Sequence, residues 1–168
     1  AVAGTCVTVT LEGRRPMVTE VQALADATDL PTPRRATSGL DRARVDMILA
    51  VLARRAKVPL GKHDVFVSTV GGVRLSEPAA DLAVALALAS AFQDRAVRAG
   101  TIAFGESGLA GEVRPVTGAH RRLAEAARLG FRAAIVPPGV LGSGPLPAQM
   151  QVAEAATLAE AIRLASAH

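Results

Sequence analysis

The sequence predicts a single mixed α/β domain, built on one mixed sheet with about four helices. Its 168 residues are 50% hydrophobic, which is enough to bury a core of one-domain size. Residues 6–11 alternate apolar side chains with threonines, which is typical of a half-buried strand. Residues 79–92 are apolar on almost every side, which is typical of a helix at the centre of a domain. Strands and a buried helix in one chain of this size indicate the mixed class.

The first part of the chain is expected to form a hairpin and then a helix. Residues 6–11 and 17–24 are separated by a short segment of glycine and charged residues, so they predict two paired strands. A proline-rich loop leads into a short extended piece at residues 34–38. Asp41 is a suitable N-cap for a helix that runs to about Lys57.

The middle of the chain combines a strand, a glycine turn and the buried helix. Residues 64–70 are rich in β-branched side chains and predict a strand. The pair Gly71-Gly72 permits a turn that other residues resist. Pro78 suits the first turn of the buried helix, and Ser76 is expected to be the N-cap of that helix.

The last part of the chain alternates short strands with helices. The predicted elements are strands at residues 101–104, 133–136 and 150–152, helices at 118–129 and 157–165, and loops at 105–111 and 139–147. Because the chain has only 4 phenylalanines and neither tryptophan nor tyrosine, we expect all four phenylalanines to lie in the core.

Composition excludes several classes of protein. The net charge of +4 and the high apolar content exclude a disordered chain. The longest apolar run, residues 82–92, is only about half as long as a membrane helix must be. No charged and then apolar leader is present, which predicts a cytoplasmic protein. The chain begins Ala1-Val2-Ala3, without methionine, so we expect it to be a piece of a longer protein.

No metal or cofactor site is expected in this domain. Cys6 is the single cysteine, so it has no partner for a disulfide or a zinc site. Gly61-Lys62 is followed by a histidine, so the phosphate loop that needs serine or threonine there is absent. The three histidines lack the spacing of metal ligands; they are His63, His120 and His168.

The positive charge is concentrated in two blocks. Residues 31–62 hold eight basic and two acidic residues, and residues 114–132 hold five basic and one acidic residue. Of the 19 basic residues, 17 are arginine, which is favoured where phosphate groups are bound through two hydrogen bonds. Two interpretations remain open: solvated helix faces, or a surface that binds a polyanion. With so few aromatic residues, any contact to nucleic acid would be electrostatic.

The motifs in the middle of the chain resemble the proteolytic domain of the Lon proteases. They are the Gly71-Gly72 turn, the segment EPAAD at residues 77–81, and the segment FGESGLAGEVRPV at residues 104–116. The Lon nucleophile is the serine of a G-P-S-A-G turn, and its partner is a lysine in P-[VI]-G-G-[LI]-K-E-K. The matching positions here are Ala79 and His120. A methyl group cannot attack a carbonyl, so the resemblance implies a Lon-like domain without catalysis, a pseudo-protease.

Five segments further resemble the C-terminal domain of the RadA (Sms) family of bacterial DNA repair proteins. They are residues 11–24, 33–52, 64–90, 104–116 and 125–137. The resemblance covers residues 4–165 of a single domain at 1–168. It implies a zinc finger and a RecA-like ATPase elsewhere in the protein, which would use zinc, ATP and magnesium. It also implies hexameric rings, branch migration on recombination intermediates, and a RecA-type recombinase as a partner.

Three functions follow for the domain itself. The first is ring assembly together with sequence-independent contact to the backbone of single- and double-stranded DNA. The arginines predicted to make that contact are Arg34, Arg35, Arg44, Arg54, Arg55, Arg74, Arg121 and Arg122, of which Arg44 is the one we expect to be structural. The second is an oligomerisation scaffold without DNA contact. The third is a residual hydrolase that uses Ser76 or Ser107 with His120. A related Lon-like domain occurs in the magnesium-chelatase-like ComM proteins, which residues 11–24 match less well.

Overall fold

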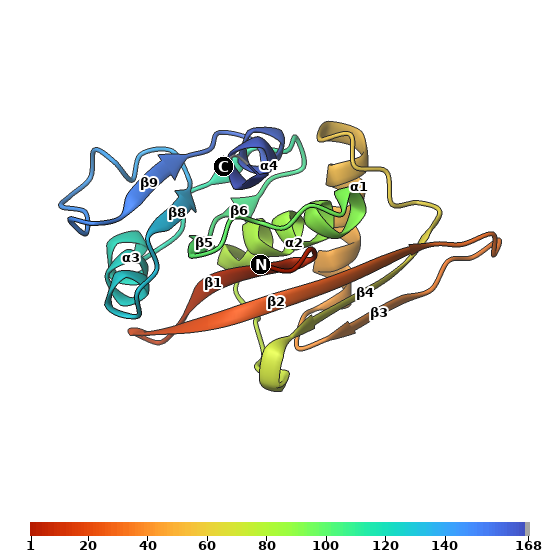
Figure 1. The fold of residues 1–168 in the computed structure, drawn as a ribbon, viewed down its shortest axis with the longest axis horizontal. Helices are drawn as coiled ribbons and strands as arrows, with labels where there is room; N and C mark the ends of the chain where they lie inside the picture. The colour runs from red at the N-terminus through yellow and green to blue at the C-terminus, as the bar shows by residue number, and fades with distance from the viewer. Residues whose placement is uncertain (167–168) are drawn as a thin grey trace.

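Seven strands form one mixed sheet in the computed structural model, which describes residues 1–166. The strands are β1 (Thr5–Glu12), β2 (Arg15–Ala27), β3 (Arg35–Ser38), β4 (His63–Thr69), β5 (Thr101–Ala103), β8 (Ala133–Val136) and β9 (Gln151–Glu154). Their order across the sheet is β3-β4-β2-β1-β5-β8-β9 (Figure 1). Strand β2 is antiparallel to β1 and β4, and the other neighbours run parallel. The predicted mixed α/β class is therefore confirmed.

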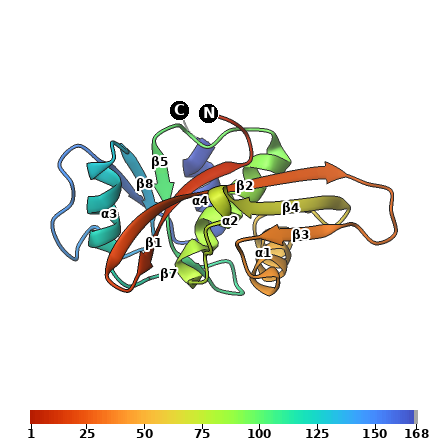
Figure 2. The ribbon, with the colours of Figure 1, turned by 90° about the horizontal axis from the view of Figure 1, so that it is seen from below.

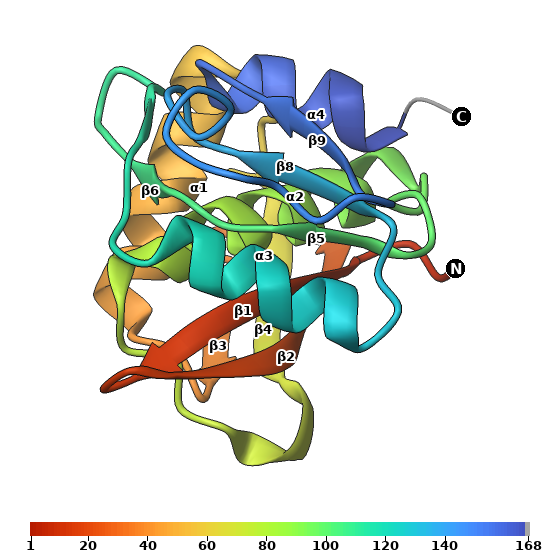
Figure 3. The same cartoon turned by 90° about the vertical axis from the view of Figure 1, so that its left-hand side faces the viewer.

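Within residues 1–166, four α-helices cover the sheet, three on one face and one on the other. They are α1 (Arg42–Arg55), α2 (Asp81–Gln93), α4 (Leu158–Ser166) and, on the opposite face, α3 (Ala119–Arg128). Two 3-10 turns, η1 (Val70–Gly72) and η2 (Pro78–Ala80), lie before α2. Figure 3 shows α3 in front of the sheet and the other helices behind it. Each face of the sheet therefore has its own apolar core.

Helix α2 is the centre of the larger core. All of its residues from Asp81 to Ser90 are buried, as its uniformly apolar sequence predicts. It packs against β1 and β2 on one side and against α1 and α4 on the other. The smaller core lies under α3, where Leu123 and Ala126 pack against Val9 and Phe104. The turn that precedes α2 is therefore joined directly to the most buried helix of the domain.

Three local predictions are corrected. Residues 105–111 are not only a loop, because β6 (Glu106–Ser107) pairs with β7 (Val113–Arg114) in a small second sheet. Ser76 is not an N-cap, because η2 begins at Pro78 and the residue flanking it is Glu77, whose side chain makes no capping bond. The phenylalanines are not all in the core, since Phe104 is fully buried but Phe66 is 37% exposed.

The face of the sheet that carries α3 is only half covered. Helix α3 contacts β1 and the hairpin end of β2, with its core extending over β5 and β8. Among residues 1–166, no helix lies over the β2-β4-β3 half of that face, as Figure 2 shows. Leu24 and Phe66 pair across β2 and β4 there and are 61% and 37% exposed. An apolar strip is therefore left open beside α3.

Candidate functional site

The turn that begins α2 is where the Lon-like motif would place its nucleophile. Ala79 lies in η2 and is 3% exposed. Its carbonyl accepts a hydrogen bond from the Gly105 amide at 2.9 Å, and the Gly105 carbonyl accepts one from the Leu82 amide at 3.0 Å. These two bonds tie the turn to the end of β5. The position therefore presents a buried methyl group on a rigid turn, and no nucleophilic atom.

The first acidic residue of this turn, Glu77, is bound by three residues from two elements, strand β1 and helix α3. Its Oε1 accepts hydrogen bonds from the Thr10 hydroxyl and the Leu11 amide, both at 3.0 Å. Arg122 Nη1 donates to the same oxygen at 2.6 Å, and Nη2 donates to Oε2 at 3.2 Å. Glu77 thereby joins the end of β1 to helix α3 across the start of α2.

Arg122 completes this arrangement from inside the protein. Its side chain is only 1% exposed. Besides Glu77, it donates to the carbonyls of Thr117 at 3.0 Å and Val9 at 2.7 Å, and its guanidinium lies 5.7 Å from the centre of the Phe104 ring. A buried guanidinium is tolerated only when its donors are paired in this way. Arg122 is therefore part of the interior and has no surface to offer a ligand.

The second acidic residue of the turn, Asp81, is paired with helix α1. Arg44 Nε donates to Asp81 Oδ1 at 3.0 Å, and Arg44 Nη2 lies 2.5 Å from Oδ2. The Ser107 amide donates to the same carboxylate at 3.0 Å. Bidentate arginine–carboxylate pairs of this kind fix orientation as well as charge. Ala79 is thus flanked on both sides by carboxylates that arginines hold in place.

The ionisation of Glu77 is predicted to make folding depend on pH. Burial alone would raise the pKa of this carboxyl, but the hydrogen bonds from Arg122 and Leu11 outweigh it and lower the pKa below its ordinary value of 4.5. An acid with a lowered pKa stabilises the folded state above its unfolded pKa and loses that contribution as the pH falls. We expect Glu77→Gln to be less stable than the wild type at pH 7, with the difference shrinking between about pH 5 and pH 3. Urea unfolding at several pH values measures this, and a difference that stays constant with pH would contradict it.

His120 is engaged by a loop and not by either candidate serine. Its Nε2 lies 2.8 Å from Ser143 Oγ, and its Nδ1 lies 3.1 Å from the Pro145 carbonyl oxygen. The Ser107 hydroxyl is buried and donates to the Gly108 carbonyl at 3.1 Å, while Ser76 is exposed before η2. The structure therefore does not join His120 to Ser76 or Ser107, and it uses the histidine to hold residues 143–145.

The described residues hold neither a reactive thiol nor a metal-binding cluster. Burial, together with the nearby charge of Glu20, raises the pKa of the Cys6 thiol to about 12, so it is not a nucleophile at neutral pH. Among residues 1–166, no cluster of three or more histidine, cysteine or acidic side chains could hold a metal ion. His168 lies outside the described residues. No helix within residues 1–166 is long and apolar enough to span a membrane.

Four of the eight predicted DNA-contacting arginines are held by other parts of the chain. Arg44 and Arg122 form the pairs described above. Arg35 donates to the carbonyls of His63 and Leu60. Arg34 pairs with buried Asp64 at 2.7 Å, although its own side chain is 68% exposed. Each of these guanidiniums has a structural partner, which reduces what it can offer to phosphate.

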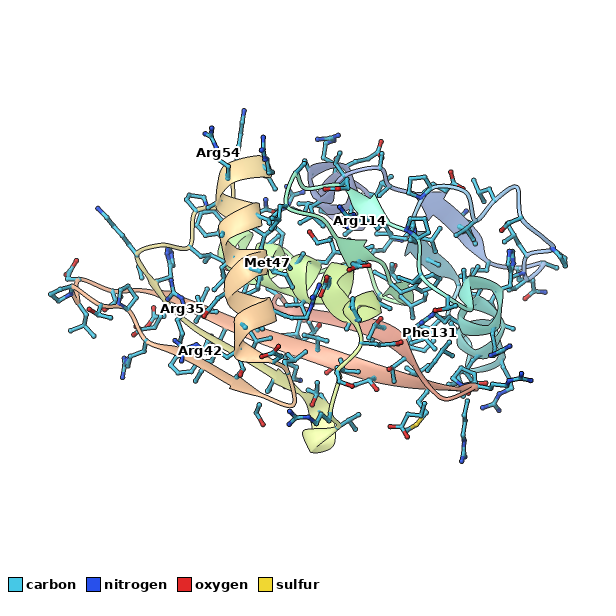
Figure 4. The ribbon with its side chains drawn as sticks, turned by 180° about the vertical axis from the view of Figure 1, so that it is seen from behind. Arg35, Arg42, Met47, Arg54, Arg114 and Phe131 are labelled. Atoms are coloured by element: carbon cyan, nitrogen blue, oxygen red, sulfur yellow. The ribbon has the colours of Figure 1, made fainter. Side chains whose placement is uncertain are left out.

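The other four arginines are exposed and are not on one surface. Arg54 and Arg55 form the last turn of α1, and Figure 4 shows Arg54 at the far end of that helix from Arg42. Arg121 lies on α3, on the opposite face of the sheet, and Arg74 follows the glycine turn of η1. None of the four forms an ion pair with any residue between 1 and 166. Arg54 and Arg55 are followed along the chain by two more exposed basic residues, Lys57 and Lys62.

Comparison with known families places this turn and its two ion pairs in a recognised domain. A family model described as subunit ChlI of Mg-chelatase matches residues 41–139, more than half of the chain. The chain belongs to this ChlI family. The matched segment runs from α1 to β8 and contains both pairs, Arg44–Asp81 and Arg122–Glu77. The ChlI-family region is thus the region that the candidate site occupies.

The chain is also similar to bacterial proteins named DNA repair protein RadA. One from Mycolicibacterium smegmatis is 55% identical over 163 residues, which is 97% of this chain and 34% of the relative. One from Synechocystis is 50% identical over 139 residues, 83% of this chain and 28% of the relative. One from Pseudomonas aeruginosa is 47% identical over 164 residues, which is 96% of this chain and 36% of the relative. This ChlI-family chain therefore spans about a third of the length of such relatives, and the predicted resemblance to RadA proteins is confirmed over nearly its whole length.

Sequence reasoning missed the two carboxylates as the centre of the site. Glu77 and Asp81 stand where the Lon-like motif has glycines. This replacement of two glycines by two acids is the sequence feature that could have pointed to the site. An acid at a buried turn requires a cation nearby. Nothing in the sequence says which of the 17 arginines supplies it, because Arg122 and Arg44 come from helices 45 and 37 residues away from their partners.

Proposed function

We propose that this chain is a non-catalytic domain of a RadA-type DNA repair protein. In this role it contributes contacts between copies in a ring and sequence-independent contacts to the DNA backbone. The similarity to proteins named DNA repair protein RadA over 97% of the chain supports the type of protein. The observation that carries the non-catalytic role is the turn at Ala79, which holds a buried methyl group between two arginine–carboxylate pairs.

The chemistry of this turn supports a domain that has kept a Lon-like framework without its reaction. Nucleophilic catalysis needs a hydroxyl, thiol or amine with a base within hydrogen-bond distance. Ala79 has no such atom, and His120, at the position of the lysine, is occupied by Ser143 and Pro145. The buried cation nearest to the turn is Arg122, whose guanidinium only donates hydrogen bonds. The two carboxylates that flank Ala79 in the sequence are each paired with an arginine.

The end of α1 is the surface that we propose for DNA. Arg54, Arg55, Lys57 and Lys62 lie within nine positions of one another, are all exposed, and form no ion pair with residues 1–166. Cations with no partner are free to replace the counterions of phosphate groups, which gives affinity without sequence preference. Arg74 lies apart from this group. One domain supplies few contacts, so tight binding would depend on several copies acting together.

The remaining parts of the activity belong to the longer protein. We propose that segments outside this chain carry a zinc finger and a RecA-like ATPase that uses ATP and magnesium. Hexameric rings, branch migration and work with a RecA-type recombinase would be properties of that whole protein. The similarity to RadA relatives supports these proposals for the whole, since this chain matches only about a third of each.

The DNA contact is tested by fluorescence anisotropy with single- and double-stranded DNA across a salt series. We expect Arg54→Glu/Arg55→Glu to weaken binding at least ~10-fold and to lower the slope of log affinity against log salt by about 2, one for each lost phosphate contact. Arg95→Glu/Arg163→Glu makes the same change of charge at two exposed positions elsewhere and is the matched control.

Three outcomes would contradict the proposal. If the wild type does not bind DNA at low salt, the domain is a scaffold only. If both double variants weaken binding equally, the effect is one of net charge and not of this surface. If the protein cleaves casein and Ser76→Ala/Ser107→Ala abolishes the cleavage, the domain is a hydrolase after all. Circular dichroism confirms that each variant is folded.

A further inference from the structure

The half-covered face of the sheet holds a groove that no part of the described chain fills. Its volume is about 480 Å³, and residues of β2, β3 and β4 line it together with residues 2–5. The floor is the row Leu24, Phe66 and Ala36, which are paired across the three strands. Sheets of mixed α/β proteins normally have such apolar faces covered. The groove is therefore a surface that lacks its cover.

Two acidic residues of β2 flank the residues that line the groove. Along β2, Glu20, Gln22, Leu24 and Asp26 point to this face, because they alternate with Val21, which is buried in the other core. Glu20 is held by Gln22 Nε2 at 2.9 Å, and Asp26 forms no ion pair with residues 1–166. Asp64 is neutralised by Arg34. Glu20 and Asp26 thus stand about 20 Å apart along β2 on either side of an apolar strip, and Arg34 lies near enough to Asp26 to interact with its charge.

The outer face of α3 has the opposite character. Arg121, Ala124 and Arg128 lie on the side of α3 away from its buried residues Leu123 and Ala126. Leu129, which ends the helix, is 48% exposed. Arg128 forms an ion pair with Glu125, with 2.8 Å between Nη2 and Oε2. Arg121 donates a long hydrogen bond of 3.5 Å to the Arg14 carbonyl. This face carries two arginines beside Ala124, of which Arg121 forms no ion pair with residues 1–166, so it is opposite in charge to the acidic residues that flank the groove.

The two surfaces also match in shape, because both belong to the same face of one sheet. Helix α3 stands on one half of that face, and the other half is bare, as Figures 2 and 3 show. A helix is about 10 Å thick, so the face has a step one helix high. A second copy turned by 180° would set its α3 on the bare half while its own bare half received the first α3. The two α3 helices would then lie side by side between two sheets.

We propose that this face forms a two-fold contact between two copies of the chain, with α3 of each copy seated in the groove of the other. Arg121 and Arg128 of one copy meet Glu20 and Asp26 of its partner, and Leu129 and Ala124 cover Leu24 and Phe66. The contact is isologous, so it closes after two copies and is separate from the head-to-tail contacts that a ring requires. It does not rest on the DNA contact proposed for α1.

Charge reversal on each side gives a test with a built-in rescue. Glu20→Arg/Asp26→Arg makes the groove basic, and Arg121→Glu/Arg128→Glu makes the helix acidic. Sedimentation velocity over a range of concentrations is expected to show the wild type reversibly forming dimers, and each variant alone associating at least ~10-fold more weakly. In a 1:1 mixture of the two variants both contacts pair opposite charges again, so we expect heterodimers with an affinity within about threefold of the wild type.

Controls and contrary outcomes are set by the same molecule. Leu24→Asp should weaken the dimer, whereas Leu109→Asp should not, although Leu109 is 71% exposed. Circular dichroism and thermal unfolding confirm that the variants fold. A wild type that stays monomeric at millimolar concentration overturns the proposal, as does a mixture that does not recover association. Dimers unaffected by any of these changes would place the contact on another face. The DNA titration of the Arg54 and Arg55 variants does not depend on whether the dimer forms.

Discussion

Replacing Arg122 with methionine is expected to lower the free energy of unfolding by about 3 kcal/mol. The methionine keeps much of the volume but leaves the Glu77 carboxylate, whose side chain is 26% exposed, without its cation. It also leaves the carbonyls of Val9 and Thr117 without a donor. Urea unfolding followed by circular dichroism measures the loss. Arg121→Met, at the exposed neighbouring position, is the matched control and should change stability by less than about 0.5 kcal/mol.

A second change separates the lost charge pair from lost packing. In Arg122→Met/Glu77→Gln the carboxylate is neutral, while its amide oxygen still accepts from the Leu11 amide and the Thr10 hydroxyl. We therefore expect the free energy of unfolding of the double variant to exceed that of Arg122→Met alone by at least about 1 kcal/mol. If Arg122→Met costs less than about 1 kcal/mol, the pair does not hold β1, the turn and α3 together as described.

Replacing Gly39 with alanine is expected to destabilise the protein by about 3 kcal/mol or more, through a clash and not through flexibility. Gly39 has φ +81°, and an added Cβ would overlap the Thr69 hydroxyl and lie 2.5 Å from the Val73 carbonyl oxygen. Neither neighbour can give way, because the Thr69 hydroxyl donates to that same carbonyl and Leu75 donates its amide to Gly39. The substitution forces the β3–α1 connection away from the glycine turn.

Gly13 provides the control for this prediction. It also has a positive φ, +63°, but nothing lies within 4 Å of an added Cβ. Gly13→Ala is therefore expected to lower the free energy of unfolding by about 1 kcal/mol, which is the cost of the left-handed backbone alone. Thermal or urea unfolding of the two variants should rank Gly39→Ala well below Gly13→Ala. Equal losses would mean that backbone conformation alone accounts for both.

Much of the secondary structure was predictable because its signals are local. The alternation at residues 6–11, the uniformly apolar α2 and the basic, amphipathic α3 each determine an element without reference to the rest of the chain. Strands β6 and β7 were missed since two residues are too few to show a period. The capping role given to Ser76 was wrong because Pro78 opens a 3-10 turn ahead of α2, which moves the boundary along the chain.

The candidate site was predictable in composition but not in connection. The absence of a nucleophile at Ala79 is read directly from the sequence, whereas the partners of Glu77 and Asp81 are not. Phe66 shows the same limit for the surface. Its strand alternates Val65 and Val67 inward with Phe66 outward, and an outward phenylalanine is buried only if something covers that face. Whether something does depends on where α3 lies, which is a property of the whole sheet.

Arg121 and Arg122 show most clearly what each level decides. From the residue pattern alone follow a basic helix, a central apolar helix and a turn without a nucleophile. The pattern could not determine that one of two adjacent arginines is exposed and the other 1% exposed and paired with Glu77. Neighbouring residues on a helix point about 100° apart, so the packing of α3 on β1 and β2 assigns one to the interior and one to the surface. The same packing covers one half of the sheet and leaves the other half open.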